Sequence, residues 1–450
     1  MTVDPGTVEV DVAVVGGGSA GSTAAIASAR GGASTLLIDA LPFLGGTSTA
    51  VLDTFYGFFT PGTRSRKVVG GIADDVVAGL RELGPVVERP NTYGAGTGVT
   101  YLAEHLKVVW ERLVQEAGAR ILLHAMVVGA DVRDGRVGSM TVATRAGLRR
   151  VRPRVVVDAS GDADLSHHAG FGYELAGSEA PAQTATTTFR MANVDAAARR
   201  TIDKDRLHAL MAEAAADGYD LPRREGSDHV TPIDGVTATI MTRLDQVRRD
   251  PDGTVRNATD PELLTELEIR GRRQALEYAR FLVDRVPGYA GASLVALGTR
   301  LGVRETRRVY GDYRVTAEDV LAARSFDDAI GLCGAPIEDH HGGEGGGTTW
   351  RYLPDGAAVG IPLRSLVVRD GTNAVVAGRC FSATQDAHAS IRSMAQCMAM
   401  GQAAGTTAAL AAAGSGQGLD VRDVPVAAVL ERLRATGAIL SLERAGEVAR

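Results

Sequence analysis

The chain has 450 residues, of which 45% are hydrophobic and 23% charged, and its formal net charge is −6 at pH 7. These proportions are typical of a globular protein with more than one domain and a core large enough to enclose a cofactor. The negative charge argues against a nucleic-acid-binding surface, which needs a basic stripe, so we expect a small-molecule partner.

The chain shows no sequence feature of export or of membrane insertion. Asp4 and Glu9 stand where a signal peptide carries basic residues. No apolar run reaches the roughly 18–20 residues of a membrane helix. The cysteines Cys333, Cys380 and Cys397 have neither paired nor metal-ligand spacing, which suits a reducing compartment. We therefore expect a cytoplasmic protein that does not enter the membrane.

The first 40 residues predict a strand, a glycine turn, a helix and a second strand. Residues 10–15 form a valine-rich run, residues 16–21 are rich in glycine, and residues 22–30 are rich in alanine. Residues 35–38 form a second apolar run, which ends at Asp39. This order is typical of a βαβ unit with parallel strands.

The turn of this unit has the glycine pattern of dinucleotide-binding folds. Gly16 suits a tight turn, Gly18 lets the backbone approach a pyrophosphate, and Gly21 allows the helix to pack close to the strand. The N-terminus of the helix would hold the pyrophosphate through its unpaired N–H groups. Asp39 can accept hydrogen bonds from the adenosine ribose. Together these features predict a bound dinucleotide.

The next segments change from helices to strands. Helical patterns occur at residues 71–83 and 101–117. Residues 121–128 predict one strand, and Asp134 and Gly135 form the centre of a predicted hairpin turn.

The middle of the chain mixes strands and helices and is interpreted as an inserted lobe. Nucleotide-fold character returns where residues 374–377 predict a strand and residues 391–413 a long helix. We expect a cofactor-binding domain in two parts, at 1–165 and 359–450, with a substrate or cap domain at 166–358 between them. The predicted fold class is α/β, a Rossmann-like domain with an inserted α+β cap.

Three further segments favour FAD over NAD as the cofactor. Residues 44–47 follow the second strand with bare backbone, residues 157–162 form a second strand-to-glycine turn, and residues 377–379 form a third. A cofactor long enough to contact all three is FAD. Residues 45–49 contain no histidine, cysteine or tyrosine, so we expect non-covalent attachment.

These motifs resemble those of the FAD-dependent oxidoreductase family of the glutathione-reductase type, with a more distant similarity to fumarate reductase flavoproteins. The matching segments are residues 16–21 with Asp39, 45–47, 158–162, 304–308, 327–330, 360–362, 376–382, 388–394 and 401–405. Asp39 departs from the family, which more often has glutamate, although the shorter acid should still reach the ribose. The resemblance implies a two-lobe flavoprotein with oxidoreductase activity and no particular substrate.

The residues predicted to bind FAD come from the glycine turns and the C-terminal segment. They are Gly16, Gly18, Ser19, Ala20, Gly21, Asp39, Ala40, Gly45, Gly46, Thr47, Ser48, Val127, Val128, Ala159, Ser160, Gly161, Asp162, Gly378, Arg379, Ser390, Ile391 and Arg392. A guanidinium and a helix N-terminus would stabilise the negative charge that reduction places on the flavin N1–C2=O edge, so Arg392 is assigned there. A structural ion pair is its alternative role. Gly401 and Gly405 would allow close packing against the sheet or the cofactor.

His388, His340 and His341 are the candidate acid/base residues. An imidazole titrates near neutral pH and could take the proton of an alcohol or amine as hydride leaves. His388 precedes the C-terminal helix and is expected near the flavin ring, and a structural role is the alternative for all three. Glu344 beside His340 and His341 is only a weak metal signal, so no metal is predicted.

Tyr56, Arg304 and Arg307 are the candidate substrate residues. The two arginines belong to the charged segment 304–308, which could clamp a carboxylate or phosphate. Glu305 in the same segment could instead join the lobes through ion pairs with arginines. Tyr56 could line a substrate pocket or pack in an aromatic core.

We expect a flavin dehydrogenase or oxidase that moves hydride from a C–H bond of a small organic molecule to flavin N5. Reduction of an activated C=C bond, as in fumarate-reductase relatives, is the second enzymatic hypothesis. A hydroxylase is disfavoured because residues 158–161 read Asp-Ala-Ser-Gly and lack the Asp-Gly pair of that group. A non-catalytic flavin-binding sensor or partner subunit is the alternative of another class. The electron acceptor and the formation of a homo-oligomer stay open.

Overall fold

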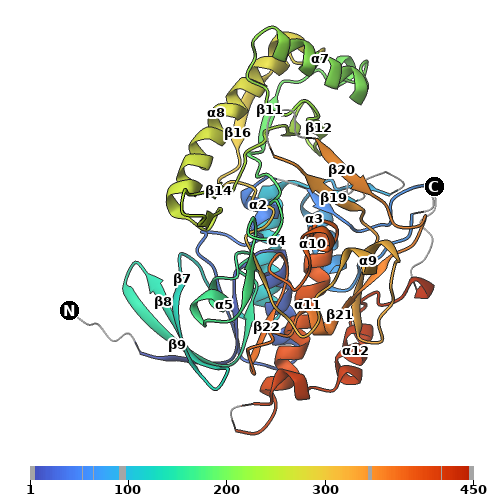
Figure 1. The fold of residues 1–450 in the computed structure, drawn as a ribbon. Coiled ribbons are helices and arrows are strands. Elements are labelled where there is room, and N and C mark those ends of the chain that lie inside the picture. Colours follow the sequence, from blue (N-terminus) through green and yellow to red (C-terminus); the bar gives the residue numbers. More distant parts are fainter. Residues whose placement is uncertain are drawn as a thin grey trace.

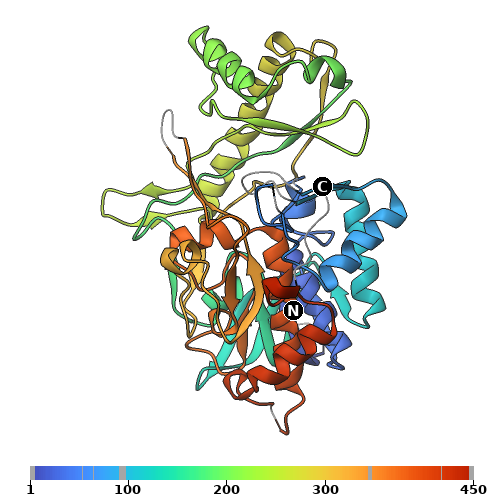
Figure 2. The same cartoon turned by 90° about the vertical axis from the view of Figure 1, so that its right-hand side faces the viewer.

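The protein is described by a computed structural model, which covers residues 6–52, 54–63, 65–90, 98–342, 347–416 and 418–444. It has two lobes, with the smaller one above the larger in Figures 1 and 2. The larger lobe contains segments from both ends of the chain, and the smaller lobe contains the long helix α8 (Pro261–Arg285). One lobe is thus inserted into the other.

A parallel sheet forms the centre of the larger lobe. Its parallel strands lie in the order β6 (Arg120–Leu122), β2 (Thr35–Ile38), β1 (Val8–Val15) and β9 (Gly147–Asp158), and β22 (Ala374–Val376) also pairs with β9. The parallel pair β1–β2 confirms the predicted βαβ unit, and β22 confirms the strand predicted near the C-terminus. The fold is α/β, as predicted.

Two antiparallel strands, β7 (Met126–Arg133) and β8 (Arg136–Thr144), continue this sheet beyond β9. Asp134 and Gly135 join them with φ angles of 50° and 73°, so the predicted hairpin turn is confirmed. Positive φ at both central residues is typical of a type I′ turn. The single strand predicted before this hairpin is instead two strands, β6 and β7. His124 between them has a φ of 53°, which interrupts the extended backbone.

The long C-terminal helix begins later than predicted. The residues expected at its start belong to a separate short helix, α10 (Gln385–Ile391), with Arg392 at its C-terminal end. Helix α11 (Met394–Ala412) begins only after Ser393. The break arises because Ser393 has a ψ of 148°, which is extended rather than helical.

Helix α1 (Ser19–Arg30) and helix α11 pack with their backbones in contact. A side chain at Gly401 would collide with the carbonyl oxygen of Ala20, and one at Gly405 with that of Ala24. Because the contacts advance in the same direction along both helices, α1 and α11 run parallel. The close packing predicted at the two glycines is confirmed, but its partner is helix α1 and not the predicted sheet or cofactor, because α11 lies against α1 with its backbone in contact.

The smaller lobe, called the cap below, spans residues 189–297. Its antiparallel sheet has the order β12 (Ser227–Val230), β13 (Thr237–Ile240), β11 (Phe189–Ala192) and β16 (Ser293–Leu297). Helix α8 packs on β16. Most buried apolar side chains of the cap form a cluster separate from the core of the larger lobe. The cap therefore has a core of its own.

Residues that follow the cap return to the larger core. Val309, Val320 and Ile361 are buried in the same cluster as the side chains of β1 and α11. The division into 1–165, 166–358 and 359–450 remains a proposal, with the cap at the centre of its second segment.

Shorter elements surround these two cores. They are α2 (Thr47–Ala50), β3 (Phe55–Tyr56), α3 (Ile72–Leu83), β4 (Val87–Arg89), β5 (Gly98–Thr100), α4 (Ala103–Glu116), α5 (Asp164–His168), β10 (Tyr173–Leu175), α6 (Ala196–Arg199), α7 (Lys204–Ala216), β14 (Arg248–Arg249), β15 (Val255–Arg256), β17 (Arg307–Val309), α9 (Ala317–Leu321), β18 (Ala329–Cys333), β19 (Ile337–His340), β20 (Thr348–Arg351), β21 (Val359–Pro362) and α12 (Val426–Ala435). Helices α3 and α4 confirm the two helical patterns predicted before the hairpin.

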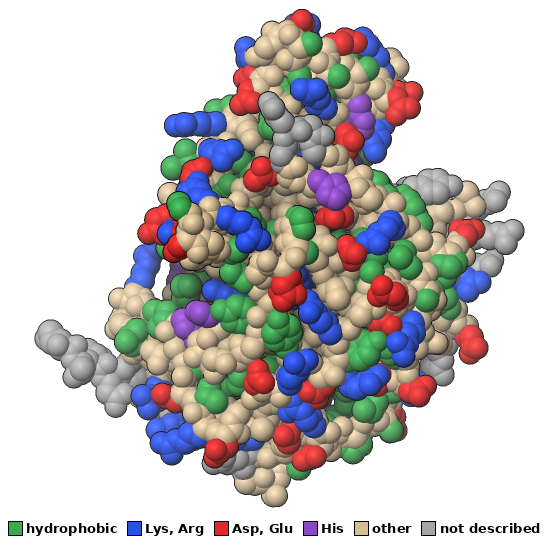
Figure 3. Space-filling view, viewed as in Figure 1, with side chains coloured by type: hydrophobic (Ala, Val, Ile, Leu, Met, Phe, Trp, Pro, Cys, Tyr) green, Lys and Arg blue, Asp and Glu red, His purple; other side chains and the backbone are tan. Residues whose placement is uncertain are grey.

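Acidic and basic side chains are interspersed over the face of the molecule shown in Figure 3. Among the residues that the structure describes, no helix has the length and apolar composition needed to cross a membrane. Cys333, Cys380 and Cys397 are buried and unpaired.

We expect Gly405→Ala to destabilise the fold, because the added methyl group would meet the carbonyl oxygen of Ala24. Overpacking of this kind lowers the free energy of unfolding by about 1–3 kcal/mol. Urea unfolding followed by circular dichroism measures the change. Gly291→Ala is the matched control, since a methyl group there meets no atom within 4 Å. Equal unfolding midpoints for the two variants would contradict the tight helix contact.

Candidate active site

Glycines shape the turn between β1 and α1. Gly16 has a φ of 96°, which glycine adopts readily, and a side chain there would collide with the carbonyl of Ala159. A side chain at Gly21 would collide with the carbonyl of Gly16. At Gly18, by contrast, a methyl group would meet only the Cα of Gly46, 3.9 Å away. Gly16 and Gly21 thus form the turn, while Gly18 leaves its backbone open to a ligand.

A second glycine segment lies directly against this turn. The Gly45 N–H donates to the carbonyl oxygen of Gly17 at 2.7 Å, and Gly45 forms an isolated parallel bridge with Gly18. Gly46 has a φ of 53°, and a methyl group on it would lie 2.9 Å from the Gly18 Cα. The Ser48 hydroxyl donates to the Gly45 carbonyl at 2.6 Å. The bare backbone predicted for this segment is therefore beside the first turn.

Asp39 ties the end of β2 to the same turn. Its carboxylate accepts hydrogen bonds from the N–H of Gly17 and, at 2.7 Å, from the N–H of Leu41. Burial raises the pKa of the Asp39 carboxyl above its ordinary value. Asp39 also lines the large cavity described below. Its contact with a ribose stays a prediction.

Asp162 holds two arginines beside the turn that follows β9. Its carboxylate accepts hydrogen bonds from Thr306 Oγ1 at 2.8 Å and from Arg379 Nη2 at 2.7 Å, and an Arg300 nitrogen lies 3.7 Å away. Burial alone would raise the pKa of Asp162, but the two guanidiniums lower it. Because Arg379 and Arg300 both line the cavity, Asp162 orients two positive charges toward it.

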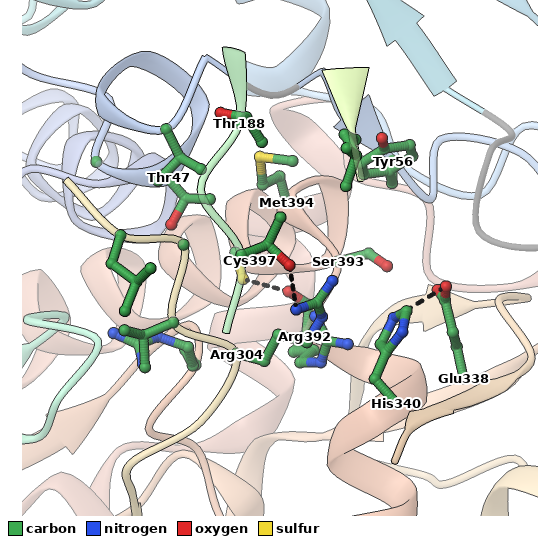
Figure 4. Close-up of a pocket in the computed structure, with 18 of the residues that line it drawn as sticks. Thr47, Tyr56, Thr188, Arg304, Glu338, His340, Arg392, Ser393, Met394 and Cys397 are labelled. Carbon is green, nitrogen blue, oxygen red and sulfur yellow. Dashed lines mark hydrogen bonds and ion pairs between the residues drawn. The ribbon is translucent and has the colours of Figure 1, made fainter. Parts of the chain in front are cut away.

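One cavity of about 700 Å³ extends from the glycine turn to the cap. Its volume is within the range of ligand-binding pockets. The predicted cofactor residues that line it are Gly16, Gly18, Ser19, Ala20, Asp39, Gly46, Thr47, Ala159, Ser160, Gly161, Gly378, Arg379 and Arg392. The predicted substrate residues Tyr56 and Arg304 line the same cavity. Figure 4 shows Arg304, Arg392 and His340 facing Thr47, Thr188 and Tyr56 across it.

Arg392 lies where the cavity meets the N-terminus of α11. Its Nη2 donates to Gln183 Oε1 at 2.9 Å, whereas its buried Nε has no hydrogen-bond partner among the described residues. Ser393, Met394 and Cys397, around the first turn of α11, line the same region. No carboxylate in the described part of the chain forms an ion pair with Arg392, although the charges of Glu338 and Glu305 attract it, and its role at the flavin stays a prediction. A buried guanidinium beside a helix N-terminus favours an anionic group here.

His340 and Glu338 form a buried pair on β19, and both line the cavity. Nε2 of His340 lies 3.1 Å from Glu338 Oε1, and its Nδ1 lies 3.2 Å from Thr348 Oγ1. Burial, followed by the positive charge of Arg304, lowers the pKa of His340 to about 3. Burial alone would raise the pKa of Glu338, but contact with His340 and the charge of Arg392 lower it to about 2. At neutral pH the neutral imidazole therefore donates its Nε2 proton to an ionised carboxylate.

The other two candidate histidines lie away from the cavity. His388 is 0% exposed, its Nε2 is 2.7 Å from the Arg379 carbonyl oxygen, and its ring stacks on Phe381. Burial lowers the pKa of His388 well below its ordinary value. His341 instead contacts Thr349 Oγ1 at 2.7 Å, on the outer side of its hairpin. Neither residue lines the cavity, so the positions of His388 and His341 do not favour the predicted acid/base role; His340 lines the cavity, and its role stays a prediction.

The arginine segment divides between the cavity and the protein interior. Arg304 lines the cavity and donates to the Thr184 carbonyl at 2.6 Å. Arg307 donates to the Asp162 carbonyl at 2.8 Å and does not line the cavity, so its position does not favour the predicted contact with substrate. The buried Arg308 pairs with Glu305 three residues earlier in the same segment, so this ion pair does not itself join the two lobes as predicted for Glu305.

Several predicted cofactor residues lie behind the cavity wall or away from it. Those that hold the wall in place or are buried behind it are Gly21, Gly45, Ser48, Asp162, Ser390 and Ile391. Those that lie elsewhere are the exposed Ala40 and the β7 residues Val127 and Val128. The last three do not reach the cavity because Ala40 faces solvent and β7 belongs to the antiparallel edge of the sheet.

Most of the cavity wall outside the glycine turns has no motif in the sequence. The residues that line the cavity but were not predicted from the sequence include Thr186, Thr188, Arg223, His229, Arg300, Glu338, Trp350 and Tyr352. They come from the cap, from the segments that flank it and from the β19–β20 hairpin, which only the folded chain brings together. Glu338 alone had a local signal, because it stands two residues before His340 and alternate residues of a strand share a face.

The residues present fit a bound FAD. Gly18 leaves space for a phosphate at the N-terminus of α1, where backbone N–H groups are free to bind an anion. At the other end, Arg392 Nε and Arg379 Nη1 are buried and lack partners in the described part of the chain. Within the same ranges no group of three His, Cys, Asp or Glu side chains could hold a metal ion, and Glu344 lies outside them.

Comparison with known proteins places these features in a family context. A family model described as FAD dependent oxidoreductase matches residues 11–433. Digeranylgeranylglycerophospholipid reductases from Thermoplasma volcanium and Thermoplasma acidophilum are 27% and 28% identical over 236 residues. The match covers 49% of this chain and 55% of each relative, so it spans about half the length of these curated relatives.

Solved structures with a similar chain path show low sequence identity. A geranylgeranyl bacteriochlorophyll reductase-like protein from Thermoplasma acidophilum has a TM-score of 0.45 at 15% identity, covering 96% of this chain and 83% of that one. BexE, studied for oxidation in BE-7585A biosynthesis, has a TM-score of 0.48 at 15% identity and covers 95% and 69%.

We expect Gly18→Ala to fold normally and to lose FAD. The methyl group meets no protein atom closer than 3.9 Å, yet it occupies the space through which a phosphate would approach the backbone. Loss of one or two charge-assisted hydrogen bonds should raise the FAD dissociation constant by at least about tenfold. The FAD content of purified protein, read from its visible absorbance, measures this effect. The control Gly291→Ala should keep its FAD. A Gly18→Ala protein that is fully loaded with FAD would show that the pyrophosphate does not bind at Gly18.

Proposed function

The chain belongs to the FAD-dependent oxidoreductase family, and on that basis we propose that it transfers hydride between a small organic substrate and flavin N5. The family membership makes it an enzyme, so the non-catalytic sensor is not retained. One observation carries the proposal: the cavity lined by the glycine turn is also lined by Arg304, Arg392 and the His340–Glu338 pair. A finer relation to the glutathione-reductase type and a cytoplasmic location remain part of the proposal.

The positive charges of the arginines that line the cavity have a defined task in this proposal. Bound FAD would supply the redox chemistry. Arg392 and the N-terminus of α11 would hold the negative charge that accompanies reduction. Burial strengthens this interaction because less water screens it.

The His340–Glu338 pair would handle the proton of the substrate. With its Nε2 proton donated to Glu338, the neutral His340 imidazole can accept a proton only at Nδ1, which lies 3.2 Å from Thr348 Oγ1. The proton of a substrate hydroxyl or amine would therefore reach Nδ1 directly in place of the Thr348 contact or through the Thr348 hydroxyl, and the Glu338 carboxylate would stabilise the resulting imidazolium. The pKa of His340, about 3, keeps the imidazole neutral over the whole physiological range. This arrangement favours oxidation of the substrate, as in a dehydrogenase or oxidase.

Reduction of a C=C bond is the second candidate function. It is favoured by the names of the two archaeal relatives, both of which are reductases. Arg304 in the cavity wall could polarise a carbonyl group conjugated to such a bond.

Anaerobic spectroscopy separates the two directions. Oxidised holoenzyme is mixed with alcohols, amines and carbonyl compounds, and loss of the visible flavin band identifies a substrate that donates hydride. Photoreduced holoenzyme is mixed with enoates, and return of the band identifies a substrate that accepts it. A protein that responds to neither set, yet is readily photoreduced, would refute small-molecule hydride transfer.

Replacing Arg392 by glutamine should lower the flavin midpoint potential and slow its reduction while FAD content is retained. A loss of about 1.4 kcal/mol of stabilisation corresponds to about 30 mV for a two-electron couple, so a shift of at least that size is expected. Arg206→Gln, at an exposed position on α7, is the control and should leave the potential unchanged. An unchanged midpoint potential in Arg392→Gln would show that Arg392 does not stabilise the reduced flavin.

His340→Gln should slow substrate-dependent flavin reduction by about 100-fold or more, the usual contribution of an acid/base group. His341→Gln, the neighbouring residue outside the cavity, is the matched control and should retain the native rate. In the native enzyme the rate should show no step near pH 6.5 and should fall only as the pH approaches the His340 pKa of about 3. A native step near pH 6.5 that disappears in His340→Gln would contradict a neutral buried imidazole.

A further inference from the structure

Arg223 is a buried arginine at the cap end of the cavity, and the function proposed above gives it no task. It lies between α7 and β12, lines the cavity, and is only 9% exposed. Its main chain is clamped by Tyr278, whose hydroxyl accepts from the Arg223 N–H at 2.8 Å and donates to its carbonyl at 2.7 Å. The residue is therefore built into the wall rather than lying loosely across it.

The guanidinium of Arg223 is poorly satisfied by the protein. Its Nη1 donates to the Ile240 carbonyl at 3.1 Å, and its buried Nε has no hydrogen-bond partner among the described residues. Nor does any described carboxylate form an ion pair with it. Two other buried arginines differ, since Arg307 pairs with Asp164 at 3.3 Å and Arg308 pairs with Glu305. A buried charge without a counter-ion is costly, so this position favours a bound anion.

The neighbouring carboxylates compensate the positive charge of Arg223 only from beyond ion-pair distance. The negative charges of Glu338 and Glu225 attract Arg223, but neither carboxylate forms an ion pair with it among the described residues, and Glu225 is exposed at the cavity surface. The buried Arg243 lies close enough for the two guanidiniums to repel each other. His229 adds no charge, because burial and then Arg89 lower its pKa to about 4.

Apolar side chains surround this end of the cavity. Ile202, Leu207 and Ile240 line it beside Arg223, and the stacked rings of Trp350 and Tyr352 stand at its wall, partly exposed. This combination suits a ligand with an apolar body and one negative group. A carboxylate matches one buried guanidinium in charge and in bidentate geometry, whereas a doubly charged phosphate would bring excess negative charge near Glu338.

We propose that Arg223 binds the carboxylate of the substrate, which is therefore an apolar organic acid. The identification of this ligand as the substrate rests on the proposed function, whereas the anion site itself does not.

The test uses holoenzyme and three probes that share one apolar body: benzoate, benzamide and phenylphosphonate. Isothermal titration calorimetry should show benzoate binding at least about tenfold more tightly than benzamide, as expected for one charge-assisted bidentate contact. This preference should vanish in Arg223→Gln and survive in part in Arg223→Lys. Lys204→Gln removes the same charge from an exposed position on the cavity wall and should keep the preference.

Absence of benzoate binding, equal binding of benzoate and benzamide, or a preference that persists in Arg223→Gln would overturn the proposal. Tighter binding of phenylphosphonate than of benzoate would mean that the Arg223 site prefers a phosphate-like group to a carboxylate. FAD content and circular dichroism establish that each variant is folded. If the carboxylate preference holds while no hydride transfer is found, the anion site stands and the proposed chemistry fails.

Discussion

The parallel contact between α1 and α11 is the constraint on which the cavity depends. Gly401 against Ala20 and Gly405 against Ala24 hold two helices from opposite ends of the chain at backbone distance. Both helices begin at the cavity, α1 beside the glycine turn and α11 beside Arg392. Parallel helix dipoles placed side by side repel each other, and negative groups at their N-termini relieve that repulsion. The packing that stabilises the larger lobe therefore also creates its preference for a long anionic ligand.

The glycine turns could be predicted from the sequence because their requirements are local. Gly16 needs a positive φ and Gly21 needs an absent side chain, and both conditions are satisfied by neighbours within the βαβ unit and its partner strand. Gly46 and Gly378 could be predicted for the same reason. A side chain at Gly46 would press on Gly18 in the first turn, and a side chain at Gly378 would press on Ala20. Such positions tolerate few residue types, so their spacing alone carries information about the fold.

The residues around the substrate end could not be predicted because burial and orientation arise only in the folded chain. His388 has a favourable position in the sequence, yet α10 directs it into the core beside Phe381. His340 and His341 are adjacent, and strand alternation alone decides that the first faces the cavity. Arg223 belongs to no motif, and its position depends on the packing of the cap around Tyr278. Secondary-structure propensity and motif spacing do not determine which of these side chains is buried and which faces the cavity.

The way in which the sheet is completed has a consequence for synthesis of the protein on the ribosome. Strand β22 and helix α11 come after the cap in the chain, yet they pair with β9 and cover α1. The N-terminal βαβ unit therefore stays incomplete, with its alanine-rich helix uncovered, until the residues of α11 (Met394–Ala412) have been synthesised. Contacts of such long sequence separation form slowly, and the exposed apolar surface invites aggregation in the interval. A nascent chain stalled within the cap should consequently depend on chaperones far more than the released protein.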